Sequence, residues 1–161
     1  MNTQIRLSLH EVTRDNWREA LQLGVHPEQQ HFVAEHVPIA AIALAKAYIQ
    51  PGGRTWVPYA FYAGTAMIGF ITLAYDPGSI NNYWIFHFFI DQHYQGQGYG
   101  KQALHLFVQF IKKYYPQCET LQLTVHPENT AARYLYMGAG FQPAGFELGE
   151  EPVYKLDLKQ H

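Results

Sequence analysis

The chain of 161 residues has a single cysteine, Cys118, and few charged side chains. One cysteine cannot form an internal disulfide, and it excludes metal sites built from several thiolates. We interpret Cys118 as a small packed thiol, because no base is evident beside it. Charged residues make up 15% of the chain, and the formal net charge is −2. Such a chain offers no basic field to a polyanion, so we expect no nucleic-acid partner.

Long apolar runs are also missing. No run approaches the ~20 residues that a membrane-spanning helix requires. The start, Met1–Arg6, lacks the charged and then apolar pattern of a signal peptide, so we expect a cytoplasmic protein with no membrane partner. Hydrophobic residues nevertheless make up 48% of the chain. That content and length favour one compact domain over residues 1–161.

The apolar periodicity predicts strands and helices that together make an α/β fold. Strands are expected over Ile5–Leu9, Trp56–Tyr62, Met67–Tyr75, Trp84–Ile90, Thr120–Val125, Phe141–Phe146 and Val153–Leu158. A first helix is expected around Trp17, Ala20, Leu21 and Leu23, after an N-cap at Thr13 or Asp15. A second helical region is expected over Gln29–Tyr48, with a break near Pro38. Two further helices are expected over Tyr99–Tyr115 and, after an N-cap at Asn129, over Thr130–Ala139.

The glycine-rich segment Gln95–Gly100 follows one of these strands and opens a helix. Glycine lacks a Cβ, so successive backbone N–H groups can turn toward one ligand, and the helix dipole adds to their attraction for phosphate. The spacing is neither that of a Walker loop, because Gln102 follows Lys101, nor that of a Rossmann fingerprint, whose last glycine would fall at Lys101. We predict a phosphate site, and the alternative is a tight turn that binds nothing.

A second motif lies on the last predicted helix. Asn129, Ala132 and Tyr136 recur every three or four residues and therefore share one helix face. Leu135 precedes the tyrosine, and Gly140-Phe141 closes the motif. Together, the glycine-rich turn and this helix resemble the GNAT superfamily of acetyl-CoA-dependent N-acetyltransferases. The resemblance spans roughly Trp56–Leu158, and the N-terminal helices fit it less distinctively.

The resemblance implies a GNAT-like α/β fold, with a mixed, mostly antiparallel sheet of about seven strands and helices on both faces. This sheet would hold acetyl-CoA, the co-substrate, in a V-shaped gap between two central strands. The main chain of the strand end would bind the pantetheine arm, the glycine turn would hold the pyrophosphate, and the helix face would complete the site. The implied cofactor-binding residues are Phe88, Phe89, Ile90, Gln95, Gly96, Gln97, Gly98, Tyr99, Gly100, Asn129, Ala132 and Tyr136. Tyr136 would also be the catalytic general acid at the thioester sulfur, although it could instead be a packing tyrosine.

The chemistry that this implies is direct attack of a neutral amine on the acetyl carbonyl, without a covalent enzyme intermediate. A backbone N–H near Ile90 can stabilise the oxyanion, and a phenol can protonate the departing thiolate. Primary amines have a pKa of about 10, so a proton must leave before attack. Many relatives place an acid four residues before Ile90, but this chain has Phe86 there. The resemblance therefore identifies no base.

Histidines do not obviously fill that role. Neighbouring strand residues point to opposite faces, so His87 is not expected to replace an acid at Phe86. His126, just past the next predicted strand, is another candidate. From the sequence we assign no metal site to the histidines, because His31 and His36 are not spaced like ligands on one helix face and no carboxylate partner is evident.

Within the superfamily, the sequence looks most like bacterial spermine/spermidine acetyltransferases. The likeness lies in the pattern from Phe88 to Gly100, in Phe32–Glu35, and in Gly149-Glu150 followed by Val153. A polyamine is therefore the leading acceptor; other small amines, peptide or protein amines, and a non-catalytic acetyl-CoA sensor are the alternatives. A homodimer is also suggested. Carboxylates that would suit a polyamine, unless they are ordinary solvated side chains, are Glu28, Glu35, Asp91, Glu147, Glu150 and Glu151.

Overall fold

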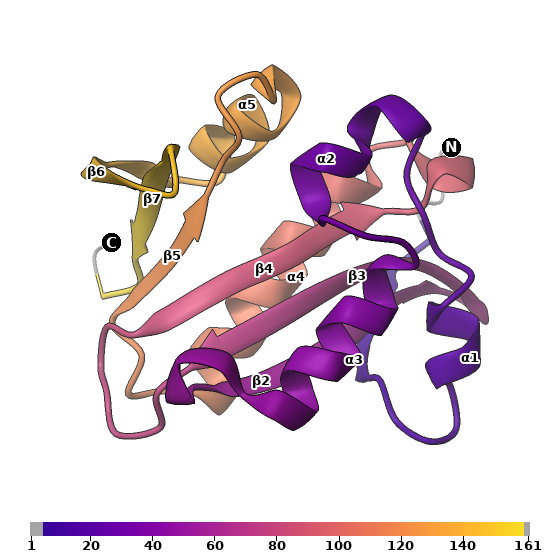
Figure 1. Cartoon of the computed structure of the whole chain (residues 1–161), viewed down its shortest axis with the longest axis horizontal. Helices are drawn as coiled ribbons and strands as arrows, with labels where there is room; N and C mark the ends of the chain where they lie inside the picture. The colour runs from indigo at the N-terminus through magenta and orange to yellow at the C-terminus, as the bar shows by residue number, and fades with distance from the viewer. Residues whose placement is uncertain (1–4, 160–161) are drawn as a thin grey trace.

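The computed structural model describes residues 5–159, and one sheet runs through them with helices on both faces (Figure 1). The strands are β1 (Leu7–Glu11), β2 (Thr55–Ala63), β3 (Ala66–Tyr75), β4 (Tyr83–Ile90), β5 (Thr120–Thr124), β6 (Gln142–Leu148) and β7 (Glu151–Asp157). The helices are α1 (Trp17–Ala20), α2 (Gln30–Val33), α3 (Ile39–Ile49), α4 (Tyr99–Tyr114) and α5 (Thr130–Gly138). Short 3₁₀ turns span Pro27–Gln29, Pro51–Gly53 and Gln92–Tyr94.

The seven strands follow the order β1-β2-β3-β4-β5-β7-β6, and only β4 and β5 pair in parallel. The predicted mixed, mostly antiparallel sheet is confirmed. β2 and β3 form an antiparallel hairpin, and its turn holds Gly64 at φ +62°. That φ is costly for a residue with a Cβ, which explains glycine at this position.

Two apolar layers cover the sheet because neighbouring strand residues face opposite sides. Ile71 of β3 lies in the layer that α4 completes with Leu104 and Phe107, all fully buried. Phe70, its neighbour, lies in the layer that the N-terminal helices complete with Ile39 of α3. Figure 1 shows these helices and α4 on opposite faces. α4 buries the face on which its apolar residues recur every three or four positions.

β4 and β5 are paired only where Trp84 lies opposite Gln122. Beyond this point the two strands diverge toward their carboxyl ends (Figure 1). β4 continues into the glycine turn and α4, whereas β5 continues through residues 125–129 into α5. The divergence leaves main-chain groups at the end of β4 that no strand on the β5 side pairs with.

The N-terminal segment departs most from prediction. β1 begins two residues later than expected, and α1 is a single turn with its N-cap at Asn16 instead of Thr13 or Asp15. The helical region expected over Gln29–Tyr48 has the predicted break near Pro38, because α2 ends at Val33 and α3 begins at Ile39. Ala34 is extended, with φ −159° and ψ 157°, and Pro38 is the N-cap of α3. Proline disfavours helical geometry at the residue directly before it, which accounts for a break next to Pro38.

No helix within residues 5–159 combines the length and the apolar character that crossing a bilayer requires.

Candidate active site

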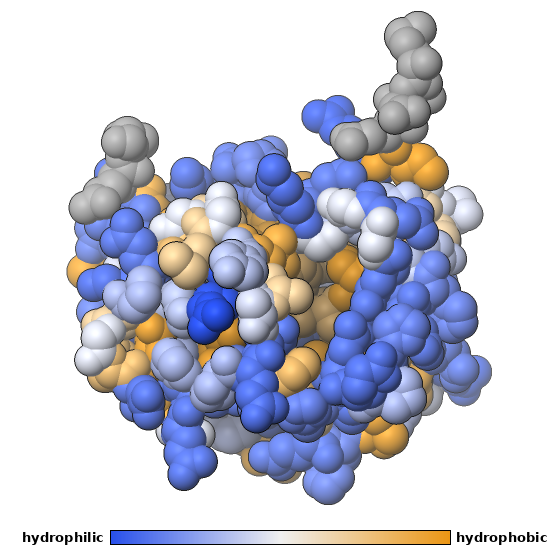
Figure 2. Space-filling view, turned by 90° about the horizontal axis from the view of Figure 1, so that it is seen from above, coloured by the Kyte–Doolittle hydropathy of each residue, from blue (hydrophilic) through white to orange (hydrophobic). Residues whose placement is uncertain are grey.

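A cavity of about 460 Å³ lies between the end of β4, the glycine turn and α5. We call it the turn cavity. Every residue that the sequence predicted to bind the cofactor lines it, with the exception of the exposed Gln97. The two motifs, which lie on different elements, are therefore brought to one site. Figure 2 looks down on this end of the molecule and shows a hollow with apolar residues inside and hydrophilic residues around it.

The glycine turn has the backbone geometry that an anion site needs. Gly96 and Gly98 have φ of +77° and +82°, and Gly98 is the N-cap of the 16-residue helix α4. A Cβ at either glycine would meet no protein atom within 4 Å, so there is space for a ligand beside the main chain. The first N–H groups of α4 have no partner within the helix and carry its positive dipole end.

The side chain of Gln95, a residue predicted to bind the cofactor, is hydrogen-bonded to other protein groups. Its side-chain amide exchanges two hydrogen bonds of 3.0 and 3.1 Å with that of Gln29 and donates a third, of 2.9 Å, to the carbonyl of Ile90. The side chain is thus engaged by protein groups and ties the N-terminal segment to the turn. Only its main chain is available to a ligand.

Tyr136 is the buried residue of α5. Its ring lies between those of Phe88 and Phe141, with centroid distances of 6.3 and 5.6 Å. Burial raises the pKa of the Tyr136 phenol well above its usual value. The phenol is therefore protonated at neutral pH and available as a proton donor. About two turns earlier, Asn129 caps α5 by accepting a hydrogen bond from the N–H of Ala132 at 3.2 Å, as predicted.

A second cavity, of about 310 Å³, adjoins the first at Tyr136. We call it the arm cavity, because α2 and α3 form one of its walls. Phe88, Asn129, Ala132 and Tyr136 line both cavities. The titratable side chains on the walls of the arm cavity are His31, Glu35, Lys46, His87, His126, Tyr136 and Glu151. Two ligands, one in each cavity, would meet at Tyr136.

Phe86 lines the arm cavity, at the position where the resemblance led us to look for an acid. Its ring packs on Trp56 at 4.8 Å, and the ammonium of Lys46 lies over both rings at 5.6 and 5.1 Å. Within residues 5–159, no carboxylate lies within ion-pair distance of Lys46. Burial lowers the pKa of this lysine. Lys46 thus lies beside Phe86, the position at which the resemblance led us to look for an acid.

His87 corrects our expectation that it faces away from Phe86. A bulge in the β3–β4 pairing gives His87 a φ of +53°, and both side chains line the arm cavity. Its Nδ1–H donates to the carbonyl of Val33 at 3.0 Å, so Nε2 is the atom that accepts from Lys46 at 3.2 Å. Burial lowers the pKa of His87 to about 4. With both nitrogens engaged and a low pKa, it is a poor base.

The predicted acidic groove is only partly assembled. Glu35 and Glu151 line the arm cavity, and Glu151 accepts a hydrogen bond of 2.8 Å from Thr124. Asp91 is instead buried and accepts hydrogen bonds from the main chain of Gly24 and from His93, so its role is structural. The other acids named from the sequence lie outside this cavity, namely Glu28, Glu147 and Glu150.

Sequence reasoning missed Lys46, although a signal was present. Lys46 follows Ile42 and Ala43 by four and three residues, so it shares their helix face and points where they point. Ile42 lines the arm cavity with it. Cys118 is buried as expected, and burial raises the pKa of its thiol to about 12, which leaves no thiolate at neutral pH.

Known proteins resemble this chain in both sequence and fold. The model of the acetyltransferase (GNAT) family matches residues 7–141. A probable spermine N(1)-acetyltransferase of Bacillus subtilis subsp. natto (strain BEST195) is 30% identical over 141 residues, which cover 84% of this chain and 88% of that protein. A spermine/spermidine N(1)-acetyltransferase of Bacillus subtilis (strain 168) matches with the same identity and coverage.

Among solved structures, the spermidine N-acetyltransferase of Vibrio cholerae in complex with CoA and spermine superposes with a TM-score of 0.71. The alignment covers 94% of each chain at 17% sequence identity. At this identity the likeness concerns the fold.

Proposed function

The chain belongs to the acetyltransferase (GNAT) family, and from this membership we propose that it transfers the acetyl group of acetyl-CoA to a small primary amine, with a polyamine such as spermidine or spermine as the leading acceptor. Acetyl-CoA is the co-substrate of this family. Two relatives named as spermine or spermine/spermidine acetyltransferases support the choice of acceptor. Glu35 and Glu151 in the arm cavity give it a physical basis.

In this proposal acetyl-CoA occupies the turn cavity. The N–H groups around Gly96 and Gly98 and at the start of α4 hold the pyrophosphate. The pantetheine lies along the end of β4, where the divergence from β5 leaves main-chain groups for it, and Asn129 contacts it from α5. The thioester then lies beside Tyr136, at the junction of the two cavities.

The acceptor amine enters the arm cavity and attacks the acetyl carbon directly. The new N–C bond forms as the C–S bond breaks, and a backbone N–H near Ile90 stabilises the oxyanion. Tyr136 gives its proton to the departing thiolate. No acyl-enzyme step is required, and the buried thiol of Cys118 is unsuited to one. Phe86 and His87 do not serve as base, which leaves Glu35, His126 and Glu151 as wall groups that can take the amine's proton, directly or through water.

The observation that carries this proposal is the adjoining position of the two cavities, which share a protonated and buried tyrosine. The test is coenzyme A release from acetyl-CoA with spermidine, spermine, aminoglycosides, amino acids and short peptides. We expect the largest kcat/KM for spermidine or spermine. Preference for another amine would reassign the acceptor. Tight acetyl-CoA binding without turnover of any acceptor would instead show a sensor.

A further inference from the structure

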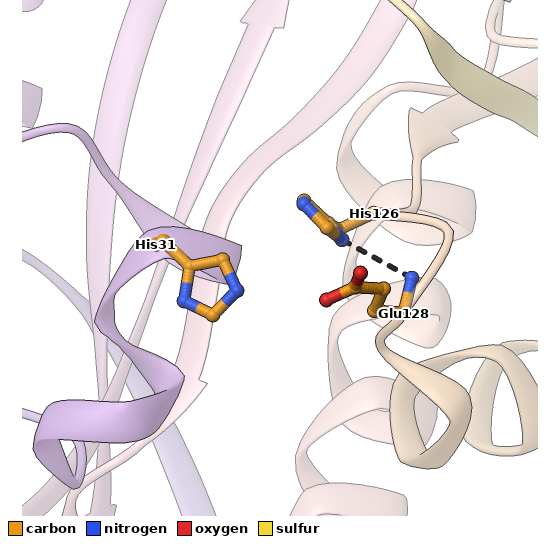
Figure 3. A group of neighbouring side chains, drawn as sticks. All are labelled: His31, His126 and Glu128. Carbon is orange, nitrogen blue, oxygen red and sulfur yellow. Dashed lines mark hydrogen bonds between the residues drawn. The ribbon is translucent and has the colours of Figure 1, made fainter.

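Two histidines and a carboxylate meet at the opening between the two halves of the site (Figure 3). His31 comes from α2, whereas His126 and Glu128 come from the loop between β5 and α5. One ligand atom from each side chain lies within 4.8 Å of the other two. The imidazole rings meet edge to face with centroids 5.1 Å apart. His31 is far from His126 and Glu128 in the sequence, and the function proposed above does not use the three side chains together.

We propose that His31, His126 and Glu128 bind one divalent transition-metal ion, with Zn²⁺ as the best match. Two imidazoles and one carboxylate form a donor set that zinc accepts with water as its fourth ligand. Zinc–ligand bonds of about 2.0–2.2 Å place tetrahedral ligands roughly 3.4 Å apart, so ligand atoms that lie within 4.8 Å of one another must approach by up to about 1.4 Å. His31 and Glu128 are exposed, and side-chain rotation alone brings them closer.

Metal binding requires a change in the hydrogen bonding or the tautomer of His126. Its Nδ1 accepts a hydrogen bond of 3.1 Å from the N–H of Glu128, so the neutral ring carries its proton on Nε2. The ring must therefore offer Nδ1 to the metal in place of this hydrogen bond, or turn and move its proton to Nδ1. The loss is one neutral hydrogen bond at a partly exposed site, which is small beside the metal–ligand bonds that replace it. Protonation of the histidines competes with the metal.

A bound ion would also act on the neighbouring cavities. His31 and His126 line the arm cavity and Glu128 lines the turn cavity, so the ion would link α2 to the β5–α5 loop. A positive charge held there would repel an entering ammonium group. We therefore expect zinc to inhibit amine acetylation in the wild-type protein. The inhibition should be lost in His31→Ala when each protein is compared with its own metal-free rate.

Calorimetric titration of ZnCl₂ into the chelator-treated, intact chain tests the site without any substrate, so its outcome is independent of the proposed function. Coenzyme A and thiol reductants are left out, because thiols bind zinc themselves. We expect one ion per chain, an affinity at least tenfold weaker in His31→Ala and His126→Ala, and a smaller loss in Glu128→Gln. His36→Ala and His105→Ala change exposed histidines outside the group and should bind zinc like the wild type.

Two results would overturn the proposal. One is the absence of binding to the wild type at millimolar zinc, and the other is equal affinity in the wild type and both histidine variants. Co²⁺ provides a check that needs no variant, since its visible absorption distinguishes four-coordinate from six-coordinate sites. Intense bands of a four-coordinate ion are expected, and a weak six-coordinate spectrum would contradict the assignment.

Discussion

Tyr136 shows that the spacing of residues in a helix can predict which of them line the site. The sequence placed it on the same helix face as Asn129 and Ala132, and all three line both cavities. Lys46 shares a face of α3 with Ile42 but belongs to no motif, so its helical spacing alone did not assign it to the site. Positions that belong to a motif were predictable; positions that depend on which helix packs over the sheet were not.

Tyr136→Phe should lower kcat for spermidine acetylation by roughly 10²-fold or more, because the proton donor to the thiolate is lost. Acetyl-CoA affinity should change little, since this interaction is made mainly in the transition state. Steady-state kinetics and calorimetry measure the two effects. Tyr134→Phe, an exposed tyrosine of the same helix, is the matched control. An unchanged kcat where chemistry limits turnover would remove Tyr136 as the acid.

Among the elements, the glycine turn and α4 make the most specific prediction. Gly98→Val should reduce acetyl-CoA affinity at least tenfold, because a branched side chain would occupy the space beside the backbone and strain a residue at φ +82°. Gly64→Val introduces comparable strain at φ +62° in the β2–β3 turn, away from the site. Calorimetry with acetyl-CoA should separate the two variants. Equal affinities, with both proteins folded, would remove the assignment of the turn.

Elements with a strong apolar periodicity were predicted well. Elements that depend on contacts between residues far apart in the sequence were not. α4 and α5 end within one residue of their predicted limits, because a continuous apolar face and a cap define them. The segment around α1 and α2 instead packs on the sheet and is positioned by hydrogen bonds to residues far away in the sequence, such as Gly24 with Asp91 and Val33 with His87. The bulge at His87 likewise has no sequence signature, and it reversed our expectation for that side chain.

At the scale of the whole molecule, the sheet explains why two cavities lie next to each other. β4 and β5 are parallel neighbours that separate after one pair, and the helices that follow them carry the two motifs. The N-terminal helices close the other side of the gap and bring Lys46 and Glu35 to it. The suggested homodimer stays a prediction. What the arrangement does favour is simultaneous binding of acetyl-CoA and an acceptor.

The most direct test of this account is an initial-rate study in which acetyl-CoA is varied at several fixed concentrations of spermidine. If the amine attacks the thioester across the junction at Tyr136, both substrates must be bound together, and the double-reciprocal lines will intersect. Parallel lines, which indicate an acetylated enzyme formed before the amine binds, would contradict direct transfer between the two cavities.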